Sequence, residues 1–246
     1  MTDIHCHILP GVDDGAENMD EAVAMARMAW ESGVRTIIAT PHCNLPGETG
    51  NYRSGAMTRR FNTLRKAVRD AGIDLEILPG AEVLCTPKVP QLLDEKKLIT
   101  LAGSRYLLVE FFFDEHLDAI DELLEQIAAR GFVPVIAHPE RYEAVQQAPH
   151  AVIRWFRSGY VIQINKGSIL GRLGRRAQGC AEWLLDRGLA HTVASDAHSD
   201  QYRTPHMSQL RRTLEDRCGS AYCNILLRIN PYNIAHDCPL ADIDEA

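Results

Sequence analysis

Residues 1–15, MTDIHCHILPGVDDG, open the chain with a strand pattern that carries metal-binding side chains. Asp3, His5 and His7 alternate with apolar residues, which is the period of a β-strand whose successive side chains point to opposite faces. The two imidazoles therefore share one face and can reach one metal ion, and Asp3 can orient an imidazole from behind. The turn after the strand brings Asp14 beside them. A buried strand with two incidental histidines is disfavoured, because burying unpaired polar groups is costly.

The composition indicates an acidic, globular chain. It has 246 residues, is 46% hydrophobic and carries a formal net charge of −7. We expect no nucleic-acid partner, because no basic run is interleaved with aromatic residues. No stretch approaches 18 continuous apolar residues, so we expect no membrane insertion. The N-terminus lacks the pattern of a signal peptide. Seven scattered cysteines with no C-x-x-C pair indicate reduced thiols, and together these features predict a cytoplasmic protein.

Apolar runs alternate with helical patterns along the whole chain, and short connections join them. Short apolar runs of this kind are typical of parallel strands covered by helices. We therefore expect one α/β domain over residues 1–246, a closed barrel of about seven (β/α) units related to the eight-unit barrel. An open doubly wound sheet is the alternative, but it would place ligands near one crevice only. The expected strands after the first are 35–40, 75–78, 106–111, 133–137, 160–165 and 191–194, and the longer helices are 19–32, 53–71, 115–130, 151–158, 175–187, 206–217 and 221–227.

Histidines and carboxylates follow nearly every expected strand at its carboxyl end, where barrel enzymes place their active sites. Only the sixth strand, with Gln163 and Asn165, offers no obvious ligand. Nine such side chains are too many for one ion, so two or three ions are implied. Imidazole and carboxylate without cysteine suit Mn²⁺, Fe²⁺ or Zn²⁺. The candidate ligands are His5, His7, Asp14, His42, Glu82, Glu110, His138, Asp196 and His198.

Two arginines follow these motifs closely. Arg141 comes three residues after His138, and Arg203 five residues after His198. A guanidinium presents a fork of donors that matches phosphate oxygens, although a surface ion pair is the simpler alternative. Cys6 points away from the imidazole face by strand alternation. The other five histidines are expected to be structural or exposed: His116, His150, His191, His206 and His236.

These motifs resemble the PHP (polymerase and histidinol phosphatase) family. The segments DIHCHILPGVDDGA, IIATPH, LPGAEV, LVEF, PVIAHPERY and TVASDAH are similar to the bacterial protein-tyrosine phosphatases of capsule and exopolysaccharide operons. The resemblance extends from Thr2 to about Asn233. It implies a distorted TIM-like (β/α)7 barrel with the active site at the carboxyl ends of the strands, and three divalent ions, Mn²⁺ foremost.

The resemblance also implies a role for each side chain. One ion would be held by His5, His7, Glu82 and Asp196; Glu82 would bridge to a second ion with His42 and Glu110; Asp14, His138 and His198 would hold the third. Arg141 and Arg203 would bind the phosphoryl group. The chain departs from the pattern at Lys166, where relatives often have serine or threonine, and we expect it to add positive charge near the mouth.

No cysteine is followed by an arginine six positions later, which excludes the Cys-x5-Arg loop of classical tyrosine phosphatases. The nucleophile is therefore expected to be a metal-activated water. The resemblance implies hydrolysis of phosphotyrosine on a protein, namely the tail of a bacterial tyrosine autokinase of polysaccharide biosynthesis. A small-molecule phosphatase of the histidinol-phosphatase type is the alternative. A PHP exonuclease would need a basic track for DNA, and a non-enzymatic metal-binding module would need no flanking arginines.

Overall fold

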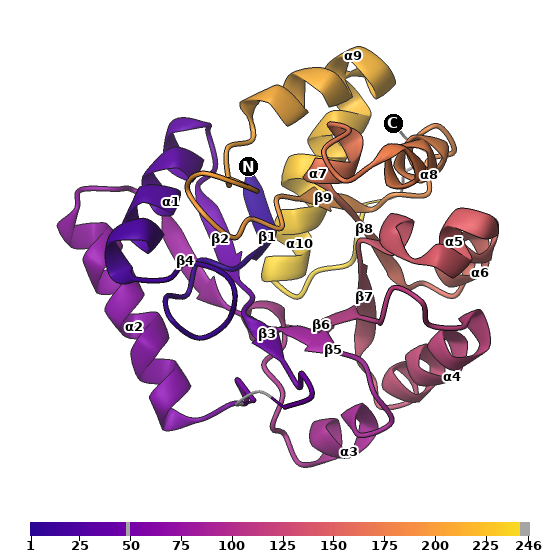
Figure 1. Ribbon diagram of the computed structural model, residues 1–246, viewed down its shortest axis with the longest axis horizontal. Coiled ribbons are helices and arrows are strands. Elements are labelled where there is room, and N and C mark those ends of the chain that lie inside the picture. Colours follow the sequence, from indigo (N-terminus) through magenta and orange to yellow (C-terminus); the bar gives the residue numbers. More distant parts are fainter. Residues whose placement is uncertain (48–49, 242–246) are drawn as a thin grey trace.

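The computed structural model describes residues 1–47 and 50–241, so the end of the expected domain at 242–246 lies outside the described residues. Strands run through the middle of the molecule and helices surround them (Figure 1). The strands are β1 (Thr2–Cys6), β2 (Thr36–Ala39), β3 (His42–Cys43), β4 (Glu76–Pro79), β5 (Glu82–Leu84), β6 (Tyr106–Glu110), β7 (Val133–Ala137), β8 (Val161–Asn165) and β9 (Thr192–Ala194).

Helices α1 to α8 lie between strands, and α9 and α10 follow the last strand. They are α1 (Met19–Glu31), α2 (Gly55–Asp70), α3 (Val89–Asp94), α4 (Leu117–Ala128), α5 (Glu143–Gln147), α6 (Ala151–Arg157), α7 (Lys166–Ile169), α8 (Arg175–Leu185), α9 (Ser208–Asn224) and α10 (Asn230–Ala235). Short 3-10 helices occupy Leu101–Gly103 and Pro139–Arg141, and a π-helical turn at Ile225–Ile229 joins α9 to α10. Gly219, at φ +81°, interrupts α9 where two separate helices were expected.

All strand pairs are parallel, as predicted, but they form two sheets, with orders β1-β2-β4 and β3-β5-β6-β7-β8-β9. The expected strands at 35–40 and 75–78 are present as β2 and β4. Each of these strands ends in the first sheet, and after two residues the chain continues in the second sheet as β3 or β5. These two short strands were not predicted. Between β4 and β5 a Cβ on Gly80 would lie 2.7 Å from Ile38 Cγ2, so glycine allows the close approach of the two chains.

The two sheets contact each other where β1 lies beside β9. His7 N donates to Ala197 O at 2.8 Å and Asp196 N donates to His5 O at 2.9 Å, beside one isolated bridge from Cys6 to Ala197. The molecule is thus a mixed α/β fold of parallel strands. The expected ring is divided into two sheets in the described residues rather than formed as one continuous sheet.

Alternating residues of the strands supply two apolar clusters. Leu107 and Val109 of β6 belong to the large cluster that includes helix residues, whereas Tyr106 and Leu108 belong to a smaller cluster built mainly from strand residues. Because successive strand side chains point to opposite faces, the helices cover one face and the strands pack on one another across the other. The strands are therefore held rigidly, and their carboxyl ends provide a fixed platform for side chains.

Candidate metal centre

The nine predicted ligands come together around Glu82, the first residue of β5. Its Oε2 atom lies 3.1 Å from His5 Nε2, from His7 Nε2 and from His42 Nδ1. Its Oε1 atom lies 2.8 Å from His138 Nε2. Glu82 is 1% exposed. A single buried carboxylate surrounded by four imidazoles is an arrangement that suits shared cations.

Ligand atoms within 4.8 Å of one another form three groups in the described residues. Two match the groups implied by the resemblance: His5, His7, Glu82 and Asp196, and His42, Glu82 and Glu110. The third differs, because Asp14 and His198 group with His7 and His42. His138, expected there, lies against Glu82 instead.

Asp13, which sequence reasoning passed over in favour of its neighbour Asp14, is the closest orienting partner of His7. Its Oδ2 atom lies 2.8 Å from His7 Nδ1 and also accepts the backbone N–H of His42 at 2.9 Å. The loop can reach this far because residue 15 is glycine: a Cβ there would lie 2.1 Å from His7 O. The Asp13-Asp14-Gly15 run was the available signal, since one carboxylate can orient a ring while the next faces the cations.

Asp3 does not orient an imidazole in this structure. The register of β1 against β2 shifts between Asp3 and Cys6, so strict alternation does not extend through the strand. Asp3 Oδ1 accepts the backbone N–H groups of Ser195 at 3.0 Å and His5 at 3.4 Å, and burial raises its pKa. Asp3 therefore ties β1 to the start of the loop after β9.

The sixth expected strand contributes two amides instead of ligands. Gln163 Oε1 lies 2.8 Å from His5 Nδ1, which directs His5 Nε2 toward Glu82. Asn165 Nδ2 donates to Asp196 Oδ2. These amides support ligands from behind, the role that outer groups play around bound metals.

Three residues of the site lie in the left-handed region of backbone space. His138, Asp196 and Arg203 have φ values of +37°, +47° and +45°. Non-glycine residues with such angles carry a conformational cost and cluster at functional sites. The turns at these strand ends direct side chains toward the metal centre, and they do so with an unfavourable backbone conformation.

The electrostatics indicate a site made for positive charge. Burial lowers the pKa of His42, but its hydrogen bond with Glu110 and the charge of Glu82 raise it to about 9. Burial also lowers the pKa of His7, and bonds with Asp13 and Glu82 more than offset this, so its pKa lies well above the ordinary value. Without a cation the carboxylates thus hold protons on His7 and His42. Divalent ions can replace these protons.

The donor set fits such ions. His138 Nδ1 is buried without a hydrogen-bond partner, and the close contacts of Glu82 Oε2 and His42 Nδ1 lack hydrogen-bond geometry. Unsatisfied buried polar atoms are rare and need an explanation. Imidazole and carboxylate donors without thiolate suit Mn²⁺, Fe²⁺ or Zn²⁺. The structure supports a metal site at these residues.

Arg141 and Arg203 approach the cluster from two elements and meet at one atom. Arg141 Nη1 lies 3.6 Å from Asp196 Oδ2, and Arg203 Nη2 forms an ion pair with the same oxygen. Both side chains remain partly exposed, at 21% and 35%. They line a cavity of about 280 Å³ together with Asp14, His42, Leu45, Glu82, Leu84, Glu110, Phe111, Phe112, Phe113, His138, Asp196 and His198.

Lys166 does not place its charge in this cavity, contrary to expectation. It is 2% exposed, and its Nζ atom donates to the backbone carbonyls of Thr204 and of His206, the latter at 3.4 Å. Burial lowers the pKa of Lys166 to about 8. The ammonium holds the loop that carries Arg203.

The thiols are unsuited to nucleophilic attack. Cys6 and Cys43 are 0% and 1% exposed, and burial raises the pKa of Cys43 to about 12. A thiol with such a pKa is protonated at neutral pH, and the thiolate is the nucleophile.

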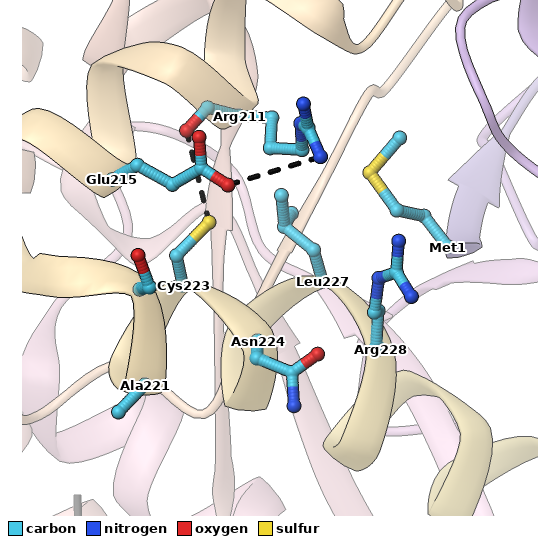
Figure 2. Close-up of a pocket in the computed structure, with 9 residues that line it drawn as sticks. Met1, Arg211, Glu215, Ala221, Cys223, Asn224, Leu227 and Arg228 are labelled. Atoms are coloured by element: carbon cyan, nitrogen blue, oxygen red, sulfur yellow. Dashed lines mark hydrogen bonds and ion pairs between the residues drawn. The ribbon is translucent and has the colours of Figure 1, made fainter.

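A larger cavity, of about 440 Å³, lies elsewhere, beside α9 and the π-helical turn (Figure 2). Its polar side chains include Arg211 and Glu215, which pair with each other at 3.8 Å. Cys223 there donates to Arg211 O at 3.7 Å. None of the three groups of candidate ligands lies in this cavity. Of these two cavities, only the one at the strand ends holds candidate metal ligands.

A parallel α/β fold with clustered imidazoles and carboxylates at its strand ends defines a metal-binding protein of the hydrolase type. The model of the family "Capsular polysaccharide synthesis, CpsB/CapC" matches residues 1–236, and the chain belongs to this family.

Curated relatives span most of the chain. Tyrosine-protein phosphatase YwqE of Bacillus subtilis is 37% identical over 222 residues, which cover 89% of this chain and 86% of the relative. Tyrosine-protein phosphatase CpsB of Streptococcus pneumoniae is 32% identical, covering 96% and 99%. A solved structure from work on these two metal-dependent tyrosine phosphatases has a TM-score of 0.91 at 34% identity, covering 98% of this chain and 96% of that chain.

Proposed function

We propose that this protein is a metal-dependent phosphomonoesterase that hydrolyses phosphotyrosine on proteins. The observation that carries the proposal is the position of Arg141 and Arg203, which flank a buried cluster of metal-ligand side chains. Its relatives that are named tyrosine-protein phosphatases support the choice of substrate. A metal-binding module without catalysis would have no use for two partly exposed guanidinium groups beside such a cluster.

We propose three divalent ions, with Mn²⁺ as the physiological metal and Fe²⁺ or Zn²⁺ as alternatives. Glu82 and Asp196, with His5 and His7, would hold one; Glu82 with His42 and Glu110 would hold the second; Asp14 and His198 would hold the third. His138 would complete the coordination beside Glu82. Bound ions of this kind supply a water of lowered pKa as nucleophile.

The arginines act on the substrate. Each guanidinium can donate to the phosphoryl oxygens from its own side. Three divalent ions would outweigh the four carboxylates among the candidate ligands, so the loaded site attracts a phosphate dianion. The same groups stabilise the charge that spreads over the phosphoryl oxygens in the transition state. The phenolate of tyrosine is a fair leaving group, so the reaction depends little on a general acid.

The physiological substrate that we propose is the phosphotyrosine-bearing tail of a tyrosine autokinase, in the cytoplasm. The family's place in capsular polysaccharide synthesis supports this. Among the described residues, no helix is long and apolar enough to cross a membrane. We further propose that the two sheets form a distorted seven-unit barrel within one domain over residues 1–246, with the metal centre at its mouth.

The test is a side-by-side assay with Mn²⁺ of a phosphotyrosine peptide, histidinol phosphate and single-stranded DNA. Preferential hydrolysis of the peptide supports the proposal. Preference for histidinol phosphate would assign the chain to the small-molecule alternative, and cleavage of DNA would assign it to the nucleases. No turnover with any metal tested would favour a binding module.

A further inference from the structure

Two aromatic side chains at the rim of the metal centre offer no atom that could bind a metal. Phe112 and Phe113 are 47% and 43% exposed, although the strand before them is buried throughout. They follow the metal-ligand residue Glu110 closely and line the cavity that holds the ligands and both arginines. Large apolar side chains left exposed beside a functional cavity indicate contact with a ligand.

Contacts hold Phe113 in place. Its ring centroid lies 6.1 Å from that of His138, edge to face, and 6.4 Å from that of Tyr142. The guanidinium carbon of Arg141 lies 4.4 Å from the ring centroid of Phe113. The ring is therefore stacked on the arginine that faces the proposed phosphoryl position.

Two leucines extend this apolar part of the cavity lining. Leu45 and Leu84 line the same cavity, and Leu84 is buried while its neighbour in the sheet, Glu110, is a candidate ligand. The cavity thus has a charged floor and an apolar wall. A phosphate ester whose phosphoryl group contacts the arginines would present its organic group to this wall.

We propose that Phe112 and Phe113, with Leu45 and Leu84, form an aryl subsite that selects phosphate esters of aromatic alcohols over those of aliphatic alcohols. The ring of the substrate lies against the phenylalanines while its phosphoryl group contacts Arg141 and Arg203. Aromatic pairs add stabilisation beyond the area they bury, and a small polar alcohol cannot make these contacts. This inference rests on the proposed function and assigns its selectivity to particular residues.

The experiment compares two non-hydrolysable inhibitors with the same anionic head, phenylphosphonate and methylphosphonate, on the Mn²⁺-loaded enzyme. The measured quantity is the ratio of their dissociation constants, obtained by calorimetric titration, which needs no turnover. We expect the wild type to bind phenylphosphonate about tenfold or more tightly, and Phe112→Ala or Phe113→Ala to remove most of that preference. Because both inhibitors share the head group, any displacement of Arg141 in Phe113→Ala cancels in the ratio.

Tyr202→Ala is the matched control. Tyr202 is 83% exposed and precedes Arg203, but it does not line the cavity, so the ratio should stay at the wild-type value. An unchanged ratio in both phenylalanine variants would overturn the aryl subsite, and so would an equal loss in Tyr202→Ala. Failure of the proposed function has a different signature: the wild type would leave phosphotyrosine peptide intact while the inhibitor ratios could still be measured.

Discussion

His7 and Asp13 form a buried pair in which the ring Nδ1 lies 2.8 Å from the carboxylate Oδ2. The pair turns His7 Nε2 toward Glu82 at 3.1 Å. We expect Asp13→Asn to lower metal affinity by about tenfold to a hundredfold, because partners of this kind fix the ring orientation and raise the basicity of the ligand. Titration of activity with Mn²⁺ measures this. Recovery of wild-type turnover at saturating Mn²⁺ is expected; a normal Mn²⁺ requirement would contradict the orienting role.

Glu82 belongs to two of the three ligand groups, whereas Glu110 belongs to one. Glu82→Gln should therefore reduce bound metal by more than one ion per chain and abolish turnover, and Glu110→Gln should remove at most one. Elemental analysis after dialysis measures both. Chelation of the wild type should abolish phosphatase activity, and Mn²⁺ should restore it. Full activity in a verified metal-free sample would refute the mechanism.

Arg141→Ala and Arg203→Ala should leave metal content unchanged and lower kcat/KM on phosphotyrosine peptide. Hydrogen bonds to charged groups contribute about 1.5–3 kcal/mol, and each 1.36 kcal/mol is about tenfold in rate. The expected loss is therefore roughly tenfold to a few hundredfold for each arginine. Lysine should restore only part of it, because a point charge cannot reproduce the fork. Arg176→Ala, at an exposed arginine of α8, is the control; near wild-type rates in both site variants would disprove the phosphate-binding role.

Lys166→Met should loosen the loop that carries Arg203, because the methionine cannot donate to the carbonyls of Thr204 and His206. We expect faster hydrogen exchange over residues 199–206 and about a tenfold loss of kcat/KM. The loss should nearly vanish in an Arg203→Ala background, since Lys166 acts through that arginine. Lys88→Met, at an exposed lysine, is the control. Fully additive losses in the double variant would show that Lys166 acts by another route.

His191 predicts a pH dependence of stability away from the metal centre. Burial lowers its pKa from 6.5 to about 4, and its Nδ1 accepts the backbone N–H of Ile162 at 3.0 Å. Between these pH values the unfolded chain binds a proton that the folded chain does not. The contribution of His191 to the free energy of unfolding is therefore fully present above pH 6.5. It is lost as the pH falls toward 4, by up to about 3 kcal/mol.

The variant His191→Asn keeps an acceptor without titrating. The difference in free energy of unfolding between wild type and His191→Asn, measured by denaturant titration at pH 7 and pH 4.5, isolates the effect. A difference that does not change with pH would show that His191 contributes nothing to acid sensitivity.

The sequence was sufficient wherever one residue type at one strand end carried the information. The period of the first strand placed His5 and His7 together, and the repeated pattern after later strands located Glu82, Glu110 and the Asp196–His198 pair. Parallel strands bring their carboxyl ends to one edge, so a local pattern implied a shared site. The alternation of apolar strands and helices likewise determined the α/β class.

Only the tertiary structure decided which of these side chains face the metal centre and which residues orient them. The register shift in β1 turns Asp3 toward backbone amides, and Gly15 lets Asp13 reach His7. The acidic residue that orients an imidazole is therefore Asp13 and not the predicted Asp3. His138 lies against Glu82 because the left-handed turn after β7 directs it there, and Lys166 is buried by a loop nearly forty residues later in the chain. Such outcomes depend on contacts between segments distant in sequence, which no local period encodes. Several side chains in this sequence could bind a metal. The packing of the strands and loops decides which of their atoms face the metal centre.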